Sequence, residues 1–141
     1  MSALAQALPR ATAIEILNFI DGEFVRSATG KTFENHSPTD GRLIGVVSEA
    51  GAIEVDAAVR AARAALAGPW GRLDLAKRCE LLYAVADEIN HRFDDFLQAE
   101  VADTGKPVSL ASHIDIPRGA ANFKVFADVV KSVPTEAFQM A

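Results

Sequence analysis

The one cysteine of the chain, Cys79, is the only residue that could supply a thiol nucleophile. A catalytic cysteine needs an exposed, electropositive setting that lowers its pKa. Cys79 falls instead on the apolar stripe of a predicted helix, because the spacing of that stripe alternates between four and three. The stripe comprises Leu75, Cys79, Leu82, Ala86, Ile89 and Phe93. We therefore expect Cys79 to be buried and structural.

Two acidic pairs could be interpreted as catalytic carboxylates. They are Asp94 with Asp95, and Glu100 with Asp103. Helical surfaces usually carry such charges on the face that meets solvent. The sequence therefore favours a solvated face and helix-end capping over acid–base chemistry.

Motifs for phosphate, metal or serine chemistry do not occur in the sequence. No two of the nine glycines are spaced as G-x-G, so there is no dinucleotide-binding turn. There is also no Walker motif and no G-x-S-x-G elbow. The spacing of His36, His91 and His113 suggests no metal site. By composition and spacing alone, the chain is a helical domain of unassigned function.

Short strands and turns are predicted to come first. Asp21-Gly22, a strong tight-turn dipeptide, lies between two apolar pairs at residues 19–20 and 24–25, which predicts a hairpin. A second hairpin is expected between residues 32–36 and 43–47, because residues 37–41 are rich in turn formers. We expect these strands to be peripheral.

Helices follow the strands. The first has an apolar stripe at Val55, Val59, Ala62 and Leu66 and stops at Gly68-Pro69. Its Asp56 and Arg60 form a predicted ion pair on the solvent side.

Three further helices are predicted. Asp74 caps the helix that carries Cys79, and a shorter helix ends at Gly105, with Pro107 just beyond. The last helix runs from about Ser112 or Asp115 to Lys131, and Pro134 breaks it. Its apolar stripe comprises Ile116, Ala120, Phe123, Ala127 and Val130. The order is strands followed by helices, without alternating βαβ units.

Length and composition fit one folded globular domain. Of the 141 residues, 50% are hydrophobic and 23% are charged. The net charge of −5 argues against a nucleic-acid partner. A single cysteine cannot form an internal disulfide. The N-terminus is no convincing signal peptide, and no run of about 18 apolar residues predicts a membrane span. We therefore expect a cytoplasmic protein.

Three motifs, in their order and separation, resemble the start of an NAD-dependent aldehyde dehydrogenase. They are NFIDGEF (residues 18–24), NHSPTDG (residues 35–41) and DTGKP (residues 103–107). The resemblance covers residues 18–141, the N-terminal part of that family's NAD-binding domain, and leaves residues 1–17 as an extension that it does not explain. It implies an α/β fold of which this portion is mainly helical with short hairpins, packed as an outer layer on a larger sheet.

A fourth motif, HIDIPRGAANF (residues 113–123), resembles the branch that oxidises 2-hydroxymuconic and 2-aminomuconic semialdehydes. That branch produces an unsaturated dicarboxylate during breakdown of aromatic rings by meta-cleavage. Within the family, a dehydrogenase for another aldehyde, such as betaine aldehyde, shares the same early motifs. A non-catalytic helical module that binds a protein partner is the alternative from another class.

The resemblance also implies which residues are used and which are missing. The family's catalytic cysteine, its glutamate base and its nucleotide glycines come later in the chain, so the 141 residues are interpreted as an N-terminal fragment that is inactive and binds no NAD alone. Uncovered apolar stripes are expected of such a fragment. The complete enzyme is expected to be a homo-oligomer.

Binding residues are carried over from the resemblance. It places a monovalent cation site at backbone oxygens near Asn35 and His36 and at Asp103, where the alternative is that Asp103 merely ends its helix. At 100° per residue, Arg118 lies about 200° around its helix from Ile116, away from the apolar stripe. The resemblance assigns Arg118 to the substrate's carboxylate, with Asn122 in support; an ordinary solvent-facing arginine is the alternative.

Overall fold

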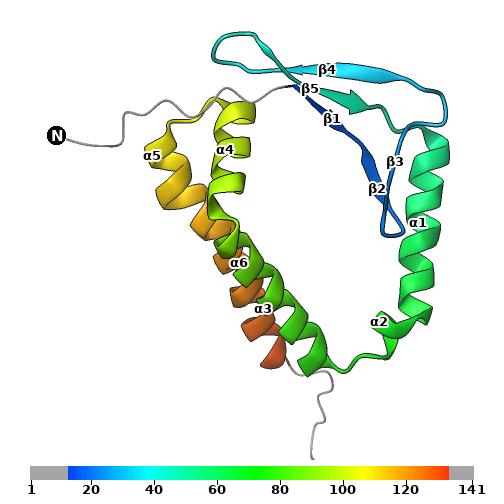
Figure 1. Cartoon of the computed structure of the whole chain (residues 1–141). Helices are drawn as coiled ribbons and strands as arrows, with labels where there is room; N and C mark the ends of the chain where they lie inside the picture. The colour runs from blue at the N-terminus through cyan, green and yellow to red at the C-terminus, as the bar shows by residue number, and fades with distance from the viewer. Residues whose placement is uncertain (1–12, 134–141) are drawn as a thin grey trace, which may run out of the picture.

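The computed structural model describes residues 13–133, in which five short strands precede the helices (Figure 1). The strands are β1 (Ile14–Ile16), β2 (Asn18–Ile20), β3 (Glu23–Val25), β4 (Thr32–His36) and β5 (Leu43–Ser48). The helical elements are α1 (Ala52–Ala67), α2 (Pro69–Arg72), α3 (Leu75–His91), α4 (Phe93–Thr104), α5 (Val108–Leu110), the π-helical turn η2 (Ala111–Asp115) and α6 (Ile116–Lys131). This order confirms the predicted one.

Both predicted hairpins are present. Strands β2 and β3 pair antiparallel around Asp21 and Gly22, whose φ angles of 53° and 84° are the positive values that a tight hairpin turn requires. Strands β4 and β5 also pair antiparallel, with a register shift between Asn35 and His36.

Strand β1 was not predicted. It pairs in parallel with β5, with Ile14 opposite Gly45, and so completes a sheet of order β1-β5-β4. Three residues without a neighbouring turn signal give no detectable periodicity, which is why sequence patterns missed them. The strand falls within residues 1–17, which were assigned to an extension; residues 1–12 lie outside the described part, and a boundary after residue 17 stays a prediction.

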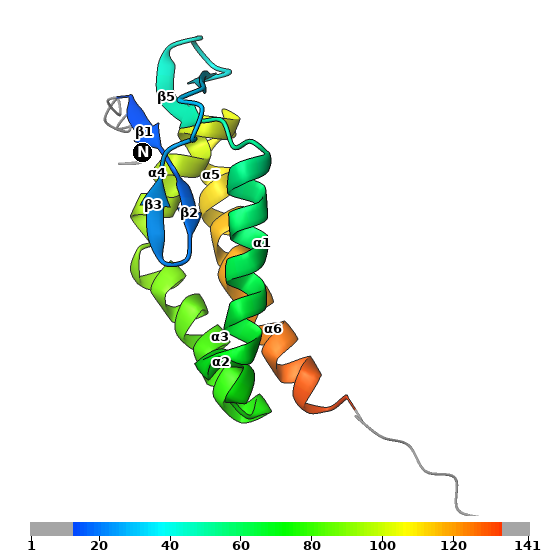
Figure 2. The same cartoon turned by 90° about the vertical axis from the view of Figure 1, so that its right-hand side faces the viewer.

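The structure has two helical arms below the three-stranded sheet in Figure 1. The open arm consists of α1, α2 and the β2–β3 hairpin beside α1, as Figure 2 shows. The packed arm consists of α3, α4, η2 and α6, with α3 lying along α6. At the end of the open arm, the ring centroid of Trp70 in α2 lies 5.6 Å from the guanidinium carbon of Arg78 in α3.

The packed arm contains most of the buried apolar residues. Cys79 and Ala86 of α3 face Ala120 and Ala127 of α6, and each of these four is at most 2% exposed. Small side chains let two helices approach closely, and the Cys79 thiol donates to the Ala127 carbonyl at 3.5 Å. The predicted burial of Cys79 is therefore confirmed.

A second cluster lies where α4 meets η2. Leu97, Ala111 and Ile116 are buried together there. The Ile116 N–H donates to the carbonyl of Ala111, five residues earlier, and this π-helical bond places the two residues on one face. Helix α4 ends as predicted at Gly105, whose φ of 70° is the left-handed conformation typical of a helix C-terminus.

The apolar stripe of α1 is exposed. Val55, Val59 and Leu66 are 57%, 44% and 66% exposed, and the Asp56–Arg60 ion pair forms as predicted. Other large apolar side chains that are exposed include Phe19, Phe24, Phe126 and Val129. Apolar surface on this scale is unusual for a complete soluble domain and fits the expectation of uncovered stripes. No helix within residues 13–133 has both the length and the apolar character that a membrane crossing needs.

Candidate functional site

Asn35 and Asp103 are brought together by the fold, although 68 residues separate them in the sequence. The Asn35 Nδ2 group donates to Asp103 Oδ1 at 2.7 Å, which joins the end of β4 to the last turn of α4. In the same two segments, a Cβ atom built on Gly105 would lie 3.0 Å from Pro38 Cγ and from Thr39 Oγ1. The NHSPTDG and DTGKP segments therefore pack against each other, and Gly105 permits their close approach.

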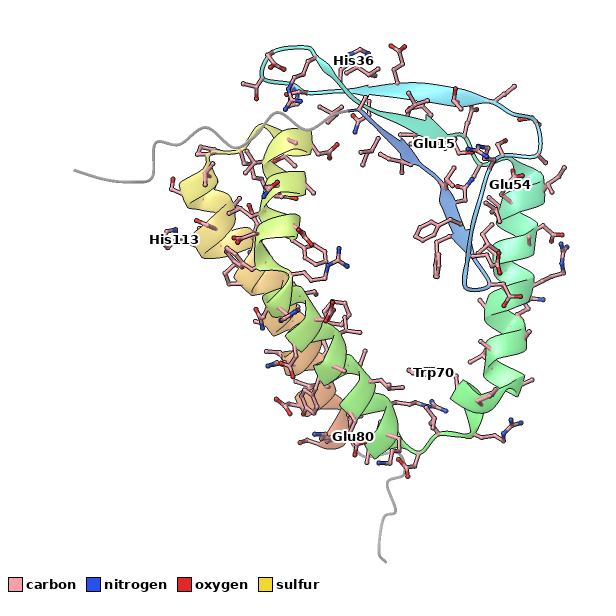
Figure 3. All side chains as sticks on the ribbon, viewed as in Figure 1. Glu15, His36, Glu54, Trp70, Glu80 and His113 are labelled. Carbon is pink, nitrogen blue, oxygen red and sulfur yellow. The ribbon has the colours of Figure 1, made fainter. Side chains whose placement is uncertain are left out.

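His36 does not turn its ring toward Asp103. Its Nδ1 lies 3.0 Å from the Gly41 carbonyl oxygen and its Nε2 lies 2.9 Å from Glu34 Oε2, both at hydrogen-bond distance. The hydrogen bond to Glu34, followed by the one to Gly41, raises the pKa of His36 above its usual value. Figure 3 shows this side chain on the outer side of β4. Any part that His36 takes in cation binding is therefore limited to its backbone oxygen, as the sequence interpretation assumed.

Lys106 forms an ion-pair cluster that sequence reasoning missed. Its Nζ lies 2.9 Å from Asp115 Oδ2 and 3.0 Å from Glu100 Oε1. The bonds to Asp115 and then to Glu100 raise the pKa of Lys106. The three side chains are 27–39% exposed, which makes them better shielded than most of the ion pairs on the described surface. Neither acid lies at a helical spacing from Lys106, so no local pattern could have predicted the cluster.

Arg118 and Asn122 are exposed in the first turns of α6. The helix buries Ile116 and Ala120, so Arg118 points away from the packed face as its spacing predicted. Among residues 13–133, the Arg118 guanidinium has no hydrogen-bond or ion-pair partner. Asp115, Arg118 and Asn122 are separated by three and four residues and so form one stripe along this helix. The Lys106 cluster thus lies one turn before the predicted substrate-binding pair.

Glu54 is a buried carboxylate whose oxygens bind the protein backbone. It accepts backbone N–H groups of Ala28 and Gly51, each at 2.7 Å, and is 5% exposed (Figure 3). These two bonds, the one from Ala28 first, lower the pKa of Glu54. Its oxygens bind the strand–helix junction, so Glu54 is a structural residue.

An open groove lies between the β2–β3 hairpin and α1. It has a volume of about 340 Å³, and its lining is Phe19, Ile20, Asp21, Gly22, Ala58, Ala61, Ala62 and Ala65. Asp21 is the only ionisable residue of this lining, which offers no pair of groups for acid–base work.

The described residues hold no catalytic constellation. Cys79 is buried, and within residues 13–133 no three His, Cys, Asp or Glu side chains are grouped closely enough to hold a metal ion. What the geometry offers for binding is the Asn35–Asp103 pair and the Arg118 guanidinium, which has no partner among these residues; the Lys106 cluster lies beside Arg118, and its charges are balanced within the cluster.

Relatives of known name match nearly all of the described chain. The chain is 65% identical over 127 residues to the 2-hydroxymuconic semialdehyde dehydrogenase of Pseudomonas sp. strain CF600, a match that covers 90% of this chain and 26% of the relative. It is 49% identical to a 2-aminomuconic 6-semialdehyde dehydrogenase of Pseudomonas sp., over 87% of this chain and 25% of that one. The chain thus spans about a quarter of the length of these relatives.

Solved structures agree with the sequence relatives. The NAD⁺ complex of an aldehyde dehydrogenase from Bacillus cereus superposes with a TM-score of 0.85 at 37% identity, over 90% of this chain and 26% of that one. The superposition confirms the predicted α/β fold, of which this chain is a mainly helical part. The model of the aldehyde dehydrogenase family matches residues 24–141, more than half of the sequence. The chain therefore belongs to the aldehyde dehydrogenase family.

Proposed function

We propose that the chain is the N-terminal portion of an NAD-dependent dehydrogenase that oxidises 2-hydroxymuconic or 2-aminomuconic semialdehyde to the unsaturated dicarboxylate. The observation that carries this proposal is the 65% identity to a 2-hydroxymuconic semialdehyde dehydrogenase. The HIDIPRGAANF segment, which includes Arg118, gives the same assignment from the sequence. The proposed setting is cytoplasmic breakdown of aromatic rings by meta-cleavage, in a homo-oligomeric enzyme.

NAD is not assigned to residues of this segment. Phosphate binding in dinucleotide folds uses a glycine-rich turn between a strand and a helix. Within residues 13–133, the chain passes from strand β5 to helix α1 through residues 49–51. Gly51 is the one glycine in this junction, and its N–H already donates to the Glu54 carboxylate. These residues do not fit the dinucleotide, so the proposal assigns NAD and the oxidation step to the parts of the relatives that this chain does not cover.

In this portion, the proposed role is recognition of the substrate's carboxylate. The guanidinium of Arg118 is exposed and unpartnered among the described residues, and its planar donor pair matches a carboxylate. Asn122 lies one turn further along the same stripe and can donate an additional hydrogen bond. A semialdehyde that carries a carboxylate would be oriented by this pair, whereas a neutral aldehyde would gain nothing from it.

A cation site is proposed at the Asn35–Asp103 contact. Hard cations favour clusters of carboxylate and backbone oxygens. Asp103 Oδ1 already accepts from Asn35, so the ligands would be the second Asp103 oxygen with backbone oxygens of Asn35 and His36. The remaining ligands would come from parts of the enzyme outside this chain, and the site's role would be to fix β4 against α4.

Arg118→Ala in the complete dehydrogenase tests the proposed function. It should raise KM for the muconic semialdehyde by a factor that corresponds to about 1.5 to 3 kcal/mol, the scale of a charged hydrogen bond. The kcat/KM for an uncharged aliphatic aldehyde should hardly change.

The matched control is Arg63→Ala, which removes another exposed arginine, on α1. It should leave kcat/KM unchanged for both aldehydes. Equal losses for both aldehydes in Arg118→Ala, or no loss for the semialdehyde, would show that Arg118 does not read the carboxylate.

A further inference from the structure

Asp115 is the acidic residue placed to compete for Arg118. It is the last residue of η2, and its backbone is helical, with φ −69° and ψ −51°. Arg118 follows three residues later in the same continuous helix, and side chains three apart on a helix are neighbours that can form an ion pair. An unpaired Asp115 carboxylate would therefore be able to form an ion pair with the Arg118 guanidinium. That ion pair would compete with the substrate's carboxylate.

Lys106 forms an ion pair with the Asp115 carboxylate. Its ammonium lies 2.9 Å from Asp115 Oδ2, and a second bond at 3.0 Å to Glu100 Oε1 holds the ammonium in place from the last turns of α4. Asp115 thereby has its charge balanced by a partner from outside its own helix. Among residues 13–133, Arg118 correspondingly has no ion-pair partner.

The π-helical turn fixes the direction in which Asp115 points. Ala111 is 0% exposed and Ile116 is 8% exposed, and the bond between them spans five residues rather than four. With both residues anchored in the cluster around Leu97, Asp115 is turned toward Lys106 on the flank of the helix. The direction of the carboxylate is thus set by packing, and its charge is balanced by Lys106.

We infer that Lys106 is a specificity-determining positioning residue, which binds Asp115 and so keeps this carboxylate from capturing Arg118. This inference rests on the proposed role of Arg118 and adds a residue that touches neither the substrate nor the cofactor. It predicts that Lys106 matters only for substrates that carry a carboxylate. It also predicts that Asp115 is harmful to substrate binding once Lys106 is gone.

The test compares variants of the complete dehydrogenase with two substrates, a muconic semialdehyde and an uncharged aliphatic aldehyde. Lys106→Met keeps the aliphatic stem and removes the charge. It should raise KM for the semialdehyde about two- to fivefold, the scale of an exposed ion pair between Asp115 and Arg118, with kcat unchanged. KM for the aliphatic aldehyde should stay within error of the wild-type value. Lys106→Arg should keep KM for the semialdehyde close to that of the wild type.

Removal of the Asp115 charge separates this inference from a merely structural ion pair. The double variant Lys106→Met/Asp115→Asn should return KM for the semialdehyde to near the wild-type value, and Asp115→Asn alone should not raise it. If the Lys106–Asp115 ion pair only stabilises the fold, the opposite is expected. Asp115→Asn would then raise KM for the semialdehyde, and the double variant would have a KM no lower than that of Lys106→Met. Asp115→Asn keeps the test decisive even where Lys106→Met does not fold.

Two references complete the design. Lys124→Met breaks another ion pair of α6, with Asp87 of α3 at 2.7 Å, and should leave the ratio of the two kcat/KM values unchanged. Arg118→Ala reports on the proposed function itself. A selective loss in Arg118→Ala without one in Lys106→Met would overturn the inference alone, whereas no selective loss in Arg118→Ala would overturn both.

Discussion

Helices α1 and α6 have the same length, 16 residues, but the chain holds them in opposite ways. Helix α6 buries Ile116, Ala120 and Ala127 against the rest of the packed arm. The one buried residue of α1 is Glu54, whose carboxylate accepts two backbone N–H groups. Helix α6 is therefore fixed by apolar packing along its length, whereas α1 is fixed by hydrogen bonds at its first turn and by contact with the hairpin.

The difference shows which apolar surface this segment leaves uncovered, the stripe on α1. An apolar stripe that is 44–66% exposed at Val55, Val59 and Leu66 gains little from folding within this segment. The chain spans 26% of a relative with which it is 65% identical, so the remainder of the proposed enzyme is available to cover α1. The packed arm should therefore be sensitive to change by itself, and the open arm only through that remainder.

The largest expected effect lies in the packed arm. Ala127→Leu adds three carbon atoms at a residue that is 0% exposed and whose carbonyl accepts the Cys79 thiol. The overpacked interface between α3 and α6 should cost about 3 kcal/mol of unfolding free energy, measured by chemical denaturation of the complete dehydrogenase. The control, Ala121→Leu, lies on the exposed side of the same helix. Similar costs for the two variants would show that the interface is looser than described.

A smaller effect is expected in the open arm. Val59→Ser should cost about 1 to 2 kcal/mol in the complete dehydrogenase, where we expect the α1 stripe to be covered. Arg60→Ser, at the next residue, breaks only the exposed pair with Asp56 and should cost less than about 1 kcal/mol. If Val59→Ser proves as mild as Arg60→Ser, then α1 is not an interface and its contrast with α6 has another cause.

Periodicity predicted the four longer helices, α1, α3, α4 and α6, but not α2 or η2, and not which helices would be covered. Val55 and Val59 have the same kind of spacing as Ile116 and Ala120, yet the first pair is exposed and the second pair buried. The spacing of apolar residues reports the face that a helix offers, whereas burial depends on which element lies opposite. The hairpin turn at Asp21-Gly22 was predictable because it depends on local backbone chemistry alone.

The candidate site was only partly predictable for the same reason. The resemblance named Asn35 and Asp103 together, and the structure joins them, but no spacing within the chain relates residues that lie 68 apart. Lys106 was overlooked because its partners Glu100 and Asp115 come from two other elements. The exposure of Arg118 followed from helical periodicity, whereas its substrate role stays a proposal.

The smallest effect concerns the polar anchor of α1 and is visible through pH. Glu54→Gln keeps the shape of the side chain but replaces one accepting oxygen with an amide that cannot accept an N–H bond. Because the bonds from Ala28 and Gly51 lower the pKa of Glu54 in the folded state, its carboxylate stabilises the fold above its unfolded pKa of about 4.3. That stabilisation disappears as the pH falls through the lower, folded pKa.

At pH 7 the Glu54→Gln enzyme should therefore melt below the wild type, and the gap in Tm should narrow as the pH is lowered toward 3, as far as the protein stays folded. Glu49→Gln is the control, because the Glu49 side chain has no hydrogen-bond partner among residues 13–133 and its replacement should change Tm little. Thermal melts of the three proteins across this pH range decide the point. A Glu54→Gln gap that stays constant from pH 7 to pH 3 would mean that the charge of Glu54 does not hold the first turn of α1, and the contrast between a polar anchor in one arm and apolar packing in the other would fail.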